Sequence, residues 1–358
     1  MSSDHFFESP LAAALGRRVI GQQRAIGTIV PYVHMYEAGL SPEGRPAGVF
    51  LLLGPTGTGK TRTVEALAAE LHGDERSLLR IDCGEFQMEH EVAKLIGAPP
   101  GYLGHRETHP MISQQKLEAV ASENSKLSLV LFDEIEKAAP SLTRLLLGVL
   151  DRATLHLGDN TVVDFTNSLV FLTSNLGARE ILSRIRPRFG LQPGGVPDPK
   201  LHARLERAAR SAVRRHFSPE FLNRIDAVIT YQPLGLETLR SILDQQLKEL
   251  QIHIRKRLGG RGFTVSATGA AREFLLEKGT SAEFGARELK RTIHRCLVQR
   301  IAELHVAGRI RPGSTVVADW DRRSDHLEIA PQGGGRIPRG ASRSDASGGE
   351  HRFLSVPA

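Results

Sequence analysis

Short apolar runs alternate with segments of helical period along the first two thirds of the chain. Each run is almost continuously apolar and rich in Val, Ile, Leu and Phe, which is typical of strands buried on both faces of a parallel sheet. Because helical patterns lie between the runs, we predict βαβ units and an α/β fold. The expected strands are residues 49–54, 78–83, 127–134, 168–175 and 227–231.

The pattern changes at Tyr231–Gly235, where a Gln-Pro-Leu-Gly segment follows the fifth run. Beyond it the chain reads as mostly helical, with two short strands expected at 314–320 and 326–330. From Gln332 onward Gly, Arg and Ser dominate and apolar residues are few, so this stretch has little to bury in a core. We therefore expect an N-terminal extension (1–10), a large domain (11–232), a smaller domain (233–331) and a disordered tail (332–358).

Composition narrows the class of protein. Hydrophobic residues at 40% and charged residues at 24% are those of an ordinary globular chain. The apolar runs are far shorter than a membrane span, and the first residues lack the basic and apolar regions of a signal peptide. The two cysteines, Cys83 and Cys296, fit no metal-binding spacing. We therefore expect a cytoplasmic protein with no membrane partner.

The formal net charge of +7 raises the question of a nucleic-acid partner. Between Arg179 and Arg224 the chain carries eleven Arg or Lys residues against four Asp or Glu, so this one segment accounts for the whole excess. A single basic segment also suits a contact between subunits. We therefore do not expect nucleic acid to be the partner.

A glycine-rich loop follows the first expected strand. Its sequence, GPTGTGKT, fits the phosphate-binding pattern G-x-x-x-x-G-K-[ST] and stands between a strand and a helical segment, the context which that pattern requires. Backbone N–H groups of such a loop close around phosphates, the lysine reaches the β and γ phosphates, and the hydroxyl ligates Mg²⁺. We therefore expect ATP and Mg²⁺ as ligands, with Lys60 and Thr61 in the last two roles. The nucleotide-binding residues of the loop are Gly54, Pro55, Thr56, Gly57, Thr58, Gly59, Lys60 and Thr61.

Two carboxylates end the third expected strand, in the segment LVLFDEIEK (129–137). In an open parallel sheet nucleotides sit at the carboxyl ends of the strands, so Asp133 and Glu134 should face the phosphate-binding loop. Asp133 is expected in the Mg²⁺ shell, and Glu134 is expected to orient and polarise the water that attacks the γ phosphate. An acidic N-cap would give the same two residues without a catalytic role. The upstream loop favours the catalytic interpretation.

Seven segments in one order give the chain a specific resemblance. They are RVIGQQRAI (18–26), GPTGTGKT (54–61), LIGAPPGYLG (95–104), LFDEIEK (131–137), FLTSNLGA (171–178), FSPEFLNRID (217–226) and FGARELKR (284–291). From residue 11 to residue 330 the chain resembles the second ATPase module of the ClpB/ClpA/ClpC unfoldases, in the AAA+ superfamily. The resemblance implies a nucleotide-binding domain with a five-stranded sheet, a helical small domain, and a homo-oligomeric, hexameric ring that acts on protein substrates.

The same resemblance assigns roles to single residues. Asn175 resembles the first sensor, which helps to position the attacking water, although a strand-end turn residue would look the same. Arg224 resembles the arginine finger, which reaches the nucleotide of the neighbouring subunit. Arg287 resembles the second sensor, which links the small domain to the nucleotide. A lone arginine is otherwise most often a solvated surface charge. The adenine pocket would be lined by Val19, Ile20 and Gly21.

Tyr102 and Leu103 lie in a loop of glycines and prolines, GAPPGYLGHRETHP (97–110), which gives an aromatic ring no evident core to enter. The resemblance makes this the loop that lines the ring's axial pore, where the aromatic face of Tyr102 grips an extended polypeptide. Packing of Tyr102 on its own domain is the alternative. The loop also holds His105 and His109 without further metal ligands, so we expect no metal site there.

These features favour an ATP-driven unfoldase or remodelling chaperone. The alternatives are a ring ATPase acting on nucleic acid through residues 179–224, and a non-threading ATP switch that regulates one partner. Residues 189–191, Phe-Gly-Leu, invite comparison with a peptidase-docking loop, but ClpB carries Arg-Phe-Gly there without a peptidase, so we expect no docking. Two departures from the family, residues 105–109 and Arg152 where an acid is usual, leave the substrate preference open.

Overall fold

The computed structural model describes residues 9–97, 110–178, 199–281 and 284–332. Five parallel strands form one sheet in the order β2-β3-β6-β1-β7, which confirms the predicted α/β fold. All five strands coincide with the expected runs to within two residues at either end. They are β1 (Gly48–Leu53), β2 (Leu79–Asp82), β3 (Ser128–Asp133), β6 (Ser168–Ser174) and β7 (Ala227–Thr230).

The central strands are apolar on both faces because helices cover both faces. Every residue of β1, β3 and β6 is buried. Side chains alternate across a strand, so Leu51 belongs to the core on one face while Phe50 belongs to the core on the other. Phe50 stacks on Phe171 of the neighbouring strand with ring centroids 5.2 Å apart. Burial of this kind on two faces explains why the runs lack polar alternation.

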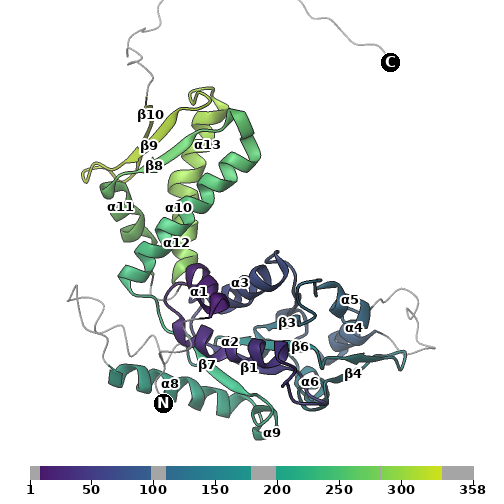
Figure 1. Cartoon of the computed structure of the whole chain (residues 1–358). Helices are drawn as coiled ribbons and strands as arrows, with labels where there is room; N and C mark the ends of the chain where they lie inside the picture. Colours follow the sequence, from purple (N-terminus) through teal and green to yellow (C-terminus); the bar gives the residue numbers. More distant parts are fainter. Residues whose placement is uncertain (1–8, 98–109, 179–198, 282–283, 333–358) are drawn as a thin grey trace, which may run out of the picture.

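Helices from different parts of the chain cover the two faces (Figure 1). The first core is completed by helices α4, α5, α6, α8 and α9, and the second by α1, α2 and α3. Side-chain caps begin several of them; the Ser9 hydroxyl, for example, accepts a hydrogen bond from the Ala12 amide at 3.1 Å. The bounds are α1 (Pro10–Arg18), α2 (Gln23–Glu37), α3 (Lys60–His72), α4 (Val92–Ile96), α5 (Gln114–Ala119), α6 (Pro140–Arg152), α8 (Pro199–His216) and α9 (Pro219–Leu222).

A smaller, mostly helical unit follows the sheet and has its own core, centred on Phe274 and Leu297. Its sheet has three strands in the order β10-β9-β8, whereas the sequence pattern predicted two. The strand that was missed, β8, is four residues long and only partly buried, so its apolar signal is weak. The elements are α10 (Leu236–Leu258), β8 (Thr264–Ala267), α11 (Gly269–Gly279), α12 (Ala286–Ile293), a π-helical turn (His294–Val298), α13 (Gln299–Val306), β9 (Thr315–Asp319) and β10 (Glu328–Gln332).

One further feature of the large unit was not predicted. The hairpin β4 (Thr154–His156) and β5 (Val162–Asp164) follows α6, and each of its strands is only three residues long. Strands of that length carry too few positions to display an alternating pattern. Among the helices that the structure describes, none combines the length and the apolar character that a bilayer span needs.

Candidate functional site

The loop after β1 wraps the head of a buried lysine. Lys60 begins α3, is 8% exposed, and donates from Nζ to the carbonyl oxygens of Gly54 at 2.6 Å and Pro55 at 3.0 Å. Its third partner is the side-chain oxygen of Asn175, at 2.9 Å. Burial lowers the pKa of Lys60 to about 8, although the nearby carboxylate of Glu136 opposes the shift. A phosphate beside this ammonium would favour its charged form and raise the pKa again, so the lysine suits an anionic ligand.

The carboxyl end of β3 presents the two expected carboxylates. Asp133 accepts hydrogen bonds on both oxygens, from the Thr173 hydroxyl and from Nη2 of Arg80 at 2.5 Å. The backbone of the next residue, Glu134, has φ 57°, which is in the left-handed region. This conformation costs a non-glycine residue free energy and is frequent at functional sites. Its backbone N–H donates to the Thr173 hydroxyl at 3.0 Å, which holds the unusual turn in place.

Asn175 joins the two halves of the site. Its Oδ1 accepts from Lys60, and its Nδ2 donates to Oε1 of Glu134 at 3.2 Å. The other carboxylate oxygen of Glu134 pairs with Lys137. The backbone N–H of Asn175 is itself fixed by Oε1 of Glu136 at 3.0 Å. The three residues Lys60, Asn175 and Glu134 therefore form one continuous polar chain, held at the end of β6.

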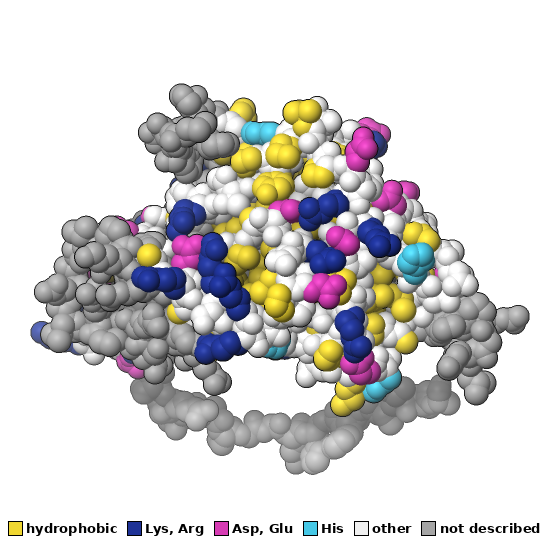
Figure 2. Space-filling view, turned by 90° about the horizontal axis from the view of Figure 1, so that it is seen from below, with side chains coloured by type: hydrophobic (Ala, Val, Ile, Leu, Met, Phe, Trp, Pro, Cys, Tyr) yellow, Lys and Arg dark blue, Asp and Glu magenta, His cyan; other side chains and the backbone are white. Residues whose placement is uncertain are grey.

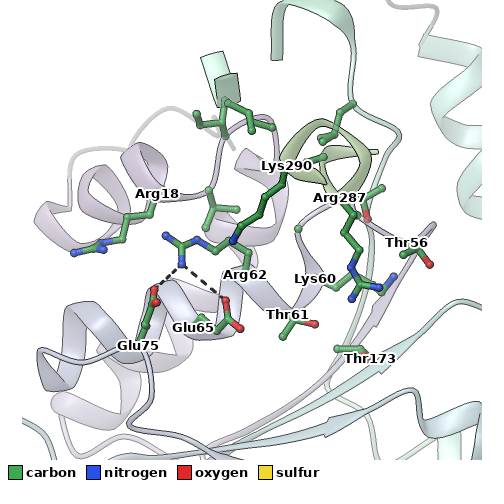
Figure 3. Close-up of a pocket in the computed structure, with 18 of the residues that line it drawn as sticks. Arg18, Thr56, Lys60, Thr61, Arg62, Glu65, Glu75, Thr173, Arg287 and Lys290 are labelled. Carbon is green, nitrogen blue, oxygen red and sulfur yellow. Dashed lines mark hydrogen bonds and ion pairs between the residues drawn. The ribbon is translucent and has the colours of Figure 1, made fainter. Parts of the chain in front are cut away.

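The small unit closes the site from above the loop. Gly57 has φ 74°, and its carbonyl accepts from the Ala286 amide at 3.1 Å. A Cβ on Gly57 would lie 2.0 Å from the carbonyl oxygen of Phe284, so only glycine permits this approach. Figure 3 shows Arg287 and Lys290 extending from α12 into the cavity that Lys60 also lines. The contact therefore brings Arg287, the candidate second sensor, to the phosphate-binding loop.

A cavity of about 760 Å³ contains most of the expected residues. Its apolar part includes Leu234 and Ile242, which sequence reasoning did not identify. Four of the expected residues, which the structure does describe, do not line the cavity: Gly21, Gly54, Pro55 and Arg224. The expected residues that do line it are Val19, Ile20, Thr56, Gly57, Thr58, Gly59, Lys60, Thr61, Asp133, Glu134, Asn175 and Arg287.

Three of the residues outside the lining still have definite places. The carbonyls of Gly54 and Pro55 hold Lys60, as described above. Gly21 has φ 80°, and a Cβ there would lie 2.6 Å from the methyl group of Thr238 on α10, so Gly21 fits the two units together. Gly21 thus lies outside the lining of the cavity, next in the chain to Val19 and Ile20, which do line it.

Arg224 lies apart from the cavity of its own chain, just after α9. Its guanidinium donates to the Glu220 carbonyl at 2.9 Å and pairs with Asp151 at 3.4 Å. Both partners belong to helices of the same face, so the side chain is held on the outer surface with a quarter of it exposed. Arg224 therefore cannot serve the nucleotide of its own chain from this position.

Thr173 and Arg80 are two polar residues of the site that sequence reasoning also missed. Thr173 lies two residues before Asn175, so strand alternation places both on the same face, and this was the available signal. Arg80 lies on β2 and reaches Asp133 only because β2 is the neighbour of β3 in the sheet. Tyr102 and Leu103 lie outside the described residues, as do His105, His109 and residues 189–191.

The donor set fits a nucleotide with Mg²⁺. Thr61 and Asp133 offer only oxygen atoms to this cavity, and oxygen is the ligand that Mg²⁺ prefers. In the described ranges no group of three or more His, Cys, Asp or Glu side chains could hold a metal ion by itself. Mg²⁺ typically uses one or two protein ligands and completes its shell with water and phosphates, which suits such a site.

The face that carries α8 bears on the question of nucleic acid. Seen from below in Figure 2, basic side chains lie among acidic and apolar ones. Arg210 of α8 pairs with Glu206 at 2.9 Å, so part of the basic charge of this helix is neutralised within it. The surface resembles a mixed contact face more than a continuous track for a phosphate backbone.

A parallel sheet of this order, a phosphate-binding loop after β1 and an acidic carboxyl end of β3 define a P-loop ATPase domain, and a helical small domain follows it. Comparison with known proteins specifies the class. Residues 45–228 match the family described as AAA domain (Cdc48 subfamily). Residues 234–318 match the C-terminal, D2-small domain, of ClpB protein. The chain belongs to this AAA family and corresponds to a second AAA module of the Clp/Hsp104 type.

Individual relatives agree with this assignment. The chaperone protein ClpB of Corynebacterium diphtheriae is 38% identical over 320 residues, which are 89% of this chain and 34% of the relative. ClpB of Meiothermus ruber is 39% identical over 300 residues, 84% of this chain and 33% of the relative. The chain thus spans about a third of the length of these curated relatives.

Solved structures agree as well. A closed state of Hsp104 with ATPγS and FITC casein is 28% identical, with a TM-score of 0.74 over 92% of this chain and 52% of that one. The extended conformation of the S. cerevisiae Hsp104:casein complex is 29% identical, with a TM-score of 0.76 over 92% of this chain and 54% of that one. The resemblance stated from the sequence is therefore confirmed at the level of the module.

Proposed function

We propose that this chain hydrolyses ATP and uses the energy to remodel protein substrates as one subunit of a ring. The observation that carries the proposal is the polar chain Lys60–Asn175–Glu134 at the base of the cavity. The side-chain amide of Asn175 links Lys60, which is expected to bind the terminal phosphates, to Glu134, which is expected to orient the attacking water. Fixed groups of this kind catalyse phosphoryl transfer by positioning and by electrostatic stabilisation.

Each group in the site has a separate task in this proposal. Lys60 would bind the terminal phosphates of ATP, and Arg287 would bring the small domain's positive charge to them. Asn175 would hold the water against Glu134, which orients it in line with the γ phosphate and accepts its proton. Thr61 and Asp133 would hold Mg²⁺, which when bound neutralises charge on the phosphate oxygens.

A ring is proposed because Arg224 lies outside its own cavity, on a surface that a second copy could cover. A heterologous contact that repeats and closes would bring each guanidinium to the next subunit's ATP, in a sixfold ring by analogy with the family. Arg224→Ala should then bind ATP normally but lose most of its hydrolysis. Mixing Arg224→Ala with Lys60→Ala subunits should recover part of the activity, because some junctions combine an intact site with an intact finger. No recovery at any ratio in verified mixed assemblies would contradict action across subunits.

Protein substrates are proposed because the Clp and Hsp104 relatives are chaperones, and the two Hsp104 structures contain casein. Threading through a pore would depend on Tyr102. Tyr102→Ala should keep ATP hydrolysis and lose the unfolding of a tagged model protein, whereas Tyr102→Phe should keep both, because the grip comes from the aromatic face. Both rates are measured side by side. Full unfolding by Tyr102→Ala would favour a regulatory switch, and absence of hydrolysis in the unaltered chain would contradict the ATPase itself.

A further inference from the structure

The carboxylate of Asp133 already has a cationic partner. Nη2 of Arg80 lies 2.5 Å from Oδ2, and the hydroxyl of Thr173 donates to Oδ1. Arg80 projects from β2 into the cavity, and half of its side chain is exposed, whereas the side chain of Asp133 is 12% exposed. The Thr173 contact is buried and local to the strand ends. The Arg80 contact is made by a half-exposed side chain that lines the cavity.

A divalent ion at Asp133 would meet this guanidinium. Both cations would draw on one carboxylate within a few ångströms of each other, and like charges at such a separation repel. Mg²⁺ also demands near-ideal geometry from each oxygen it uses, which an existing ion pair on Oδ2 disturbs. Arg80 and the ion therefore compete for Asp133.

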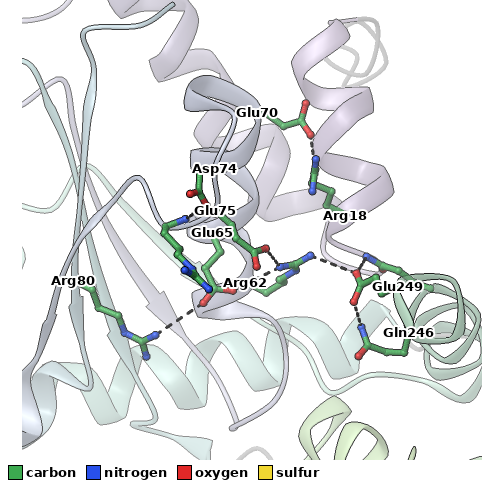
Figure 4. A network of polar contacts seen from close by, with 11 residues as sticks. Arg18, Arg62, Glu65, Glu70, Asp74, Glu75, Arg80, Gln246 and Glu249 are labelled. Atoms are coloured by element: carbon green, nitrogen blue, oxygen red, sulfur yellow. Dashed lines mark hydrogen bonds and ion pairs between the residues drawn. The ribbon is translucent and has the colours of Figure 1, made fainter. Parts of the chain in front are cut away.

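A second carboxylate is placed to receive Arg80. Oε1 of Glu65, on α3, lies 3.9 Å from Nη1 of Arg80, and Figure 4 shows the two side chains facing each other. Glu65 also lies 3.8 Å from Nη1 of Arg62. Burial raises the pKa of Glu65, and the two arginines oppose that shift, so the carboxylate is stabilised by a nearby cation. Arg80 thus has two acceptors, one at the expected metal site and one beside it.

We propose that Arg80 is a positioning residue that competes with Mg²⁺ for Asp133 and moves onto Glu65 when the ion binds. The inference rests on the proposed ATP site, which it deepens by naming what sets the Mg²⁺ requirement. It predicts that the chain demands more Mg²⁺ than Asp133 and Thr61 alone would require. A merely structural arginine would have the opposite signature, because its loss would loosen Asp133 and weaken Mg²⁺ binding.

The test measures binding, with ADP as the nucleotide so that no turnover occurs. The dissociation constant of a fluorescent ADP analogue is measured on the full chain from EDTA to excess Mg²⁺. The readout is the Mg²⁺ concentration that gives half of the gain in affinity. Arg80→Gln should lower this midpoint by about threefold to tenfold, the range for losing one charged hydrogen bond that is half exposed. Arg80→Lys keeps the charge and should stay near the unaltered value, which guards against a folding defect in Arg80→Gln.

Arg18→Gln is the matched control. Arg18 also lines the cavity and also pairs with a carboxylate, Glu70, at 2.5 Å with a similarly exposed side chain, but it does not touch Asp133. Its Mg²⁺ midpoint should stay within about twofold of the unaltered chain, since only a surface ion pair is lost.

Glu65→Gln tests the second acceptor. It should raise the Mg²⁺ midpoint in the unaltered chain, because Arg80 then loses its second carboxylate partner and stays on Asp133. When Arg80 is already Gln, the same substitution should have a much smaller effect. An unchanged or raised midpoint in Arg80→Gln, or an equal effect of Glu65→Gln in both backgrounds, would overturn the competition while leaving the ATP site intact. Failure of the unaltered chain to bind ADP under any condition would overturn the ATP site and the inference together.

Discussion

The two ends of the cavity are built differently. At the phosphate end, Lys60 and Asp133 are each 8% exposed, and their partners all come from the sheet strands and the loops of one domain. At the outer rim, Arg62 of α3 meets Glu75 at 2.6 Å and Glu249 of α10 at 3.6 Å, with a third to a half of each side chain exposed (Figure 4). A buried charge without partners is costly, whereas an exposed pair is worth little. ATP hydrolysis should therefore depend on the phosphate end, whereas the outer rim should have only a small effect on activity and affinity.

The same chemical change at each end tests this contrast most strongly. Glu134→Gln removes the carboxylate expected to act on water and should lower ATP turnover by about a hundredfold to ten-thousandfold, with ATP binding kept. Glu75→Gln removes a carboxylate at the rim and should change turnover by less than about threefold, because it loses only an exposed pair. Steady-state hydrolysis and nucleotide affinity are measured for both. Equal losses would show that the two ends are not functionally distinct.

Gly57 is the point at which the phosphate-binding loop contacts the small domain, so a substitution there should disrupt that contact. Gly57→Ala combines a left-handed backbone with a Cβ placed 2.0 Å from the Phe284 carbonyl, so the loop or the small domain must move. Nucleotide affinity should fall by about tenfold or more, the equivalent of the 1 to 3 kcal/mol that such a strained residue costs. Binding and thermal unfolding are measured together.

Gly44→Ala is its control, because Gly44 has a similar φ of 68° with open space around it. That variant should lose about 1 to 2 kcal/mol of unfolding free energy and keep its nucleotide affinity. If both variants lose affinity alike, backbone strain alone and not the contact with Phe284 explains the result.

The smallest effect is expected from the pair that joins the two domains at the rim. Glu249→Gln removes the charge that Arg62 meets from α10 and should weaken nucleotide binding by less than about fivefold. The change should fade at high salt, since the side chains are exposed and screened. Titrations at low and high salt check this. A large loss that persists in high salt would mean that the rim pair holds the domains together.

Local signals predicted much of this molecule correctly. The inner strands β1, β3 and β6 were found because both of their faces are buried, which makes the runs apolar without interruption. The Lys60 loop was found because its glycines and lysine are adjacent in sequence. The β4–β5 hairpin and β8 were not found, because strands of three or four residues in part-exposed positions carry too weak a pattern.

The sequence by itself determined the strand–loop–helix around Lys60 and the acidic end of β3, since both depend on near neighbours and on hydrophobic periodicity. Only the tertiary structure decided which charges meet there. Arg80 reaches Asp133 across 53 positions because β2 lies beside β3, and Gly57 meets Ala286 because the small unit folds back over the loop. Such pairings follow from sheet order and domain packing, which no local pattern encodes.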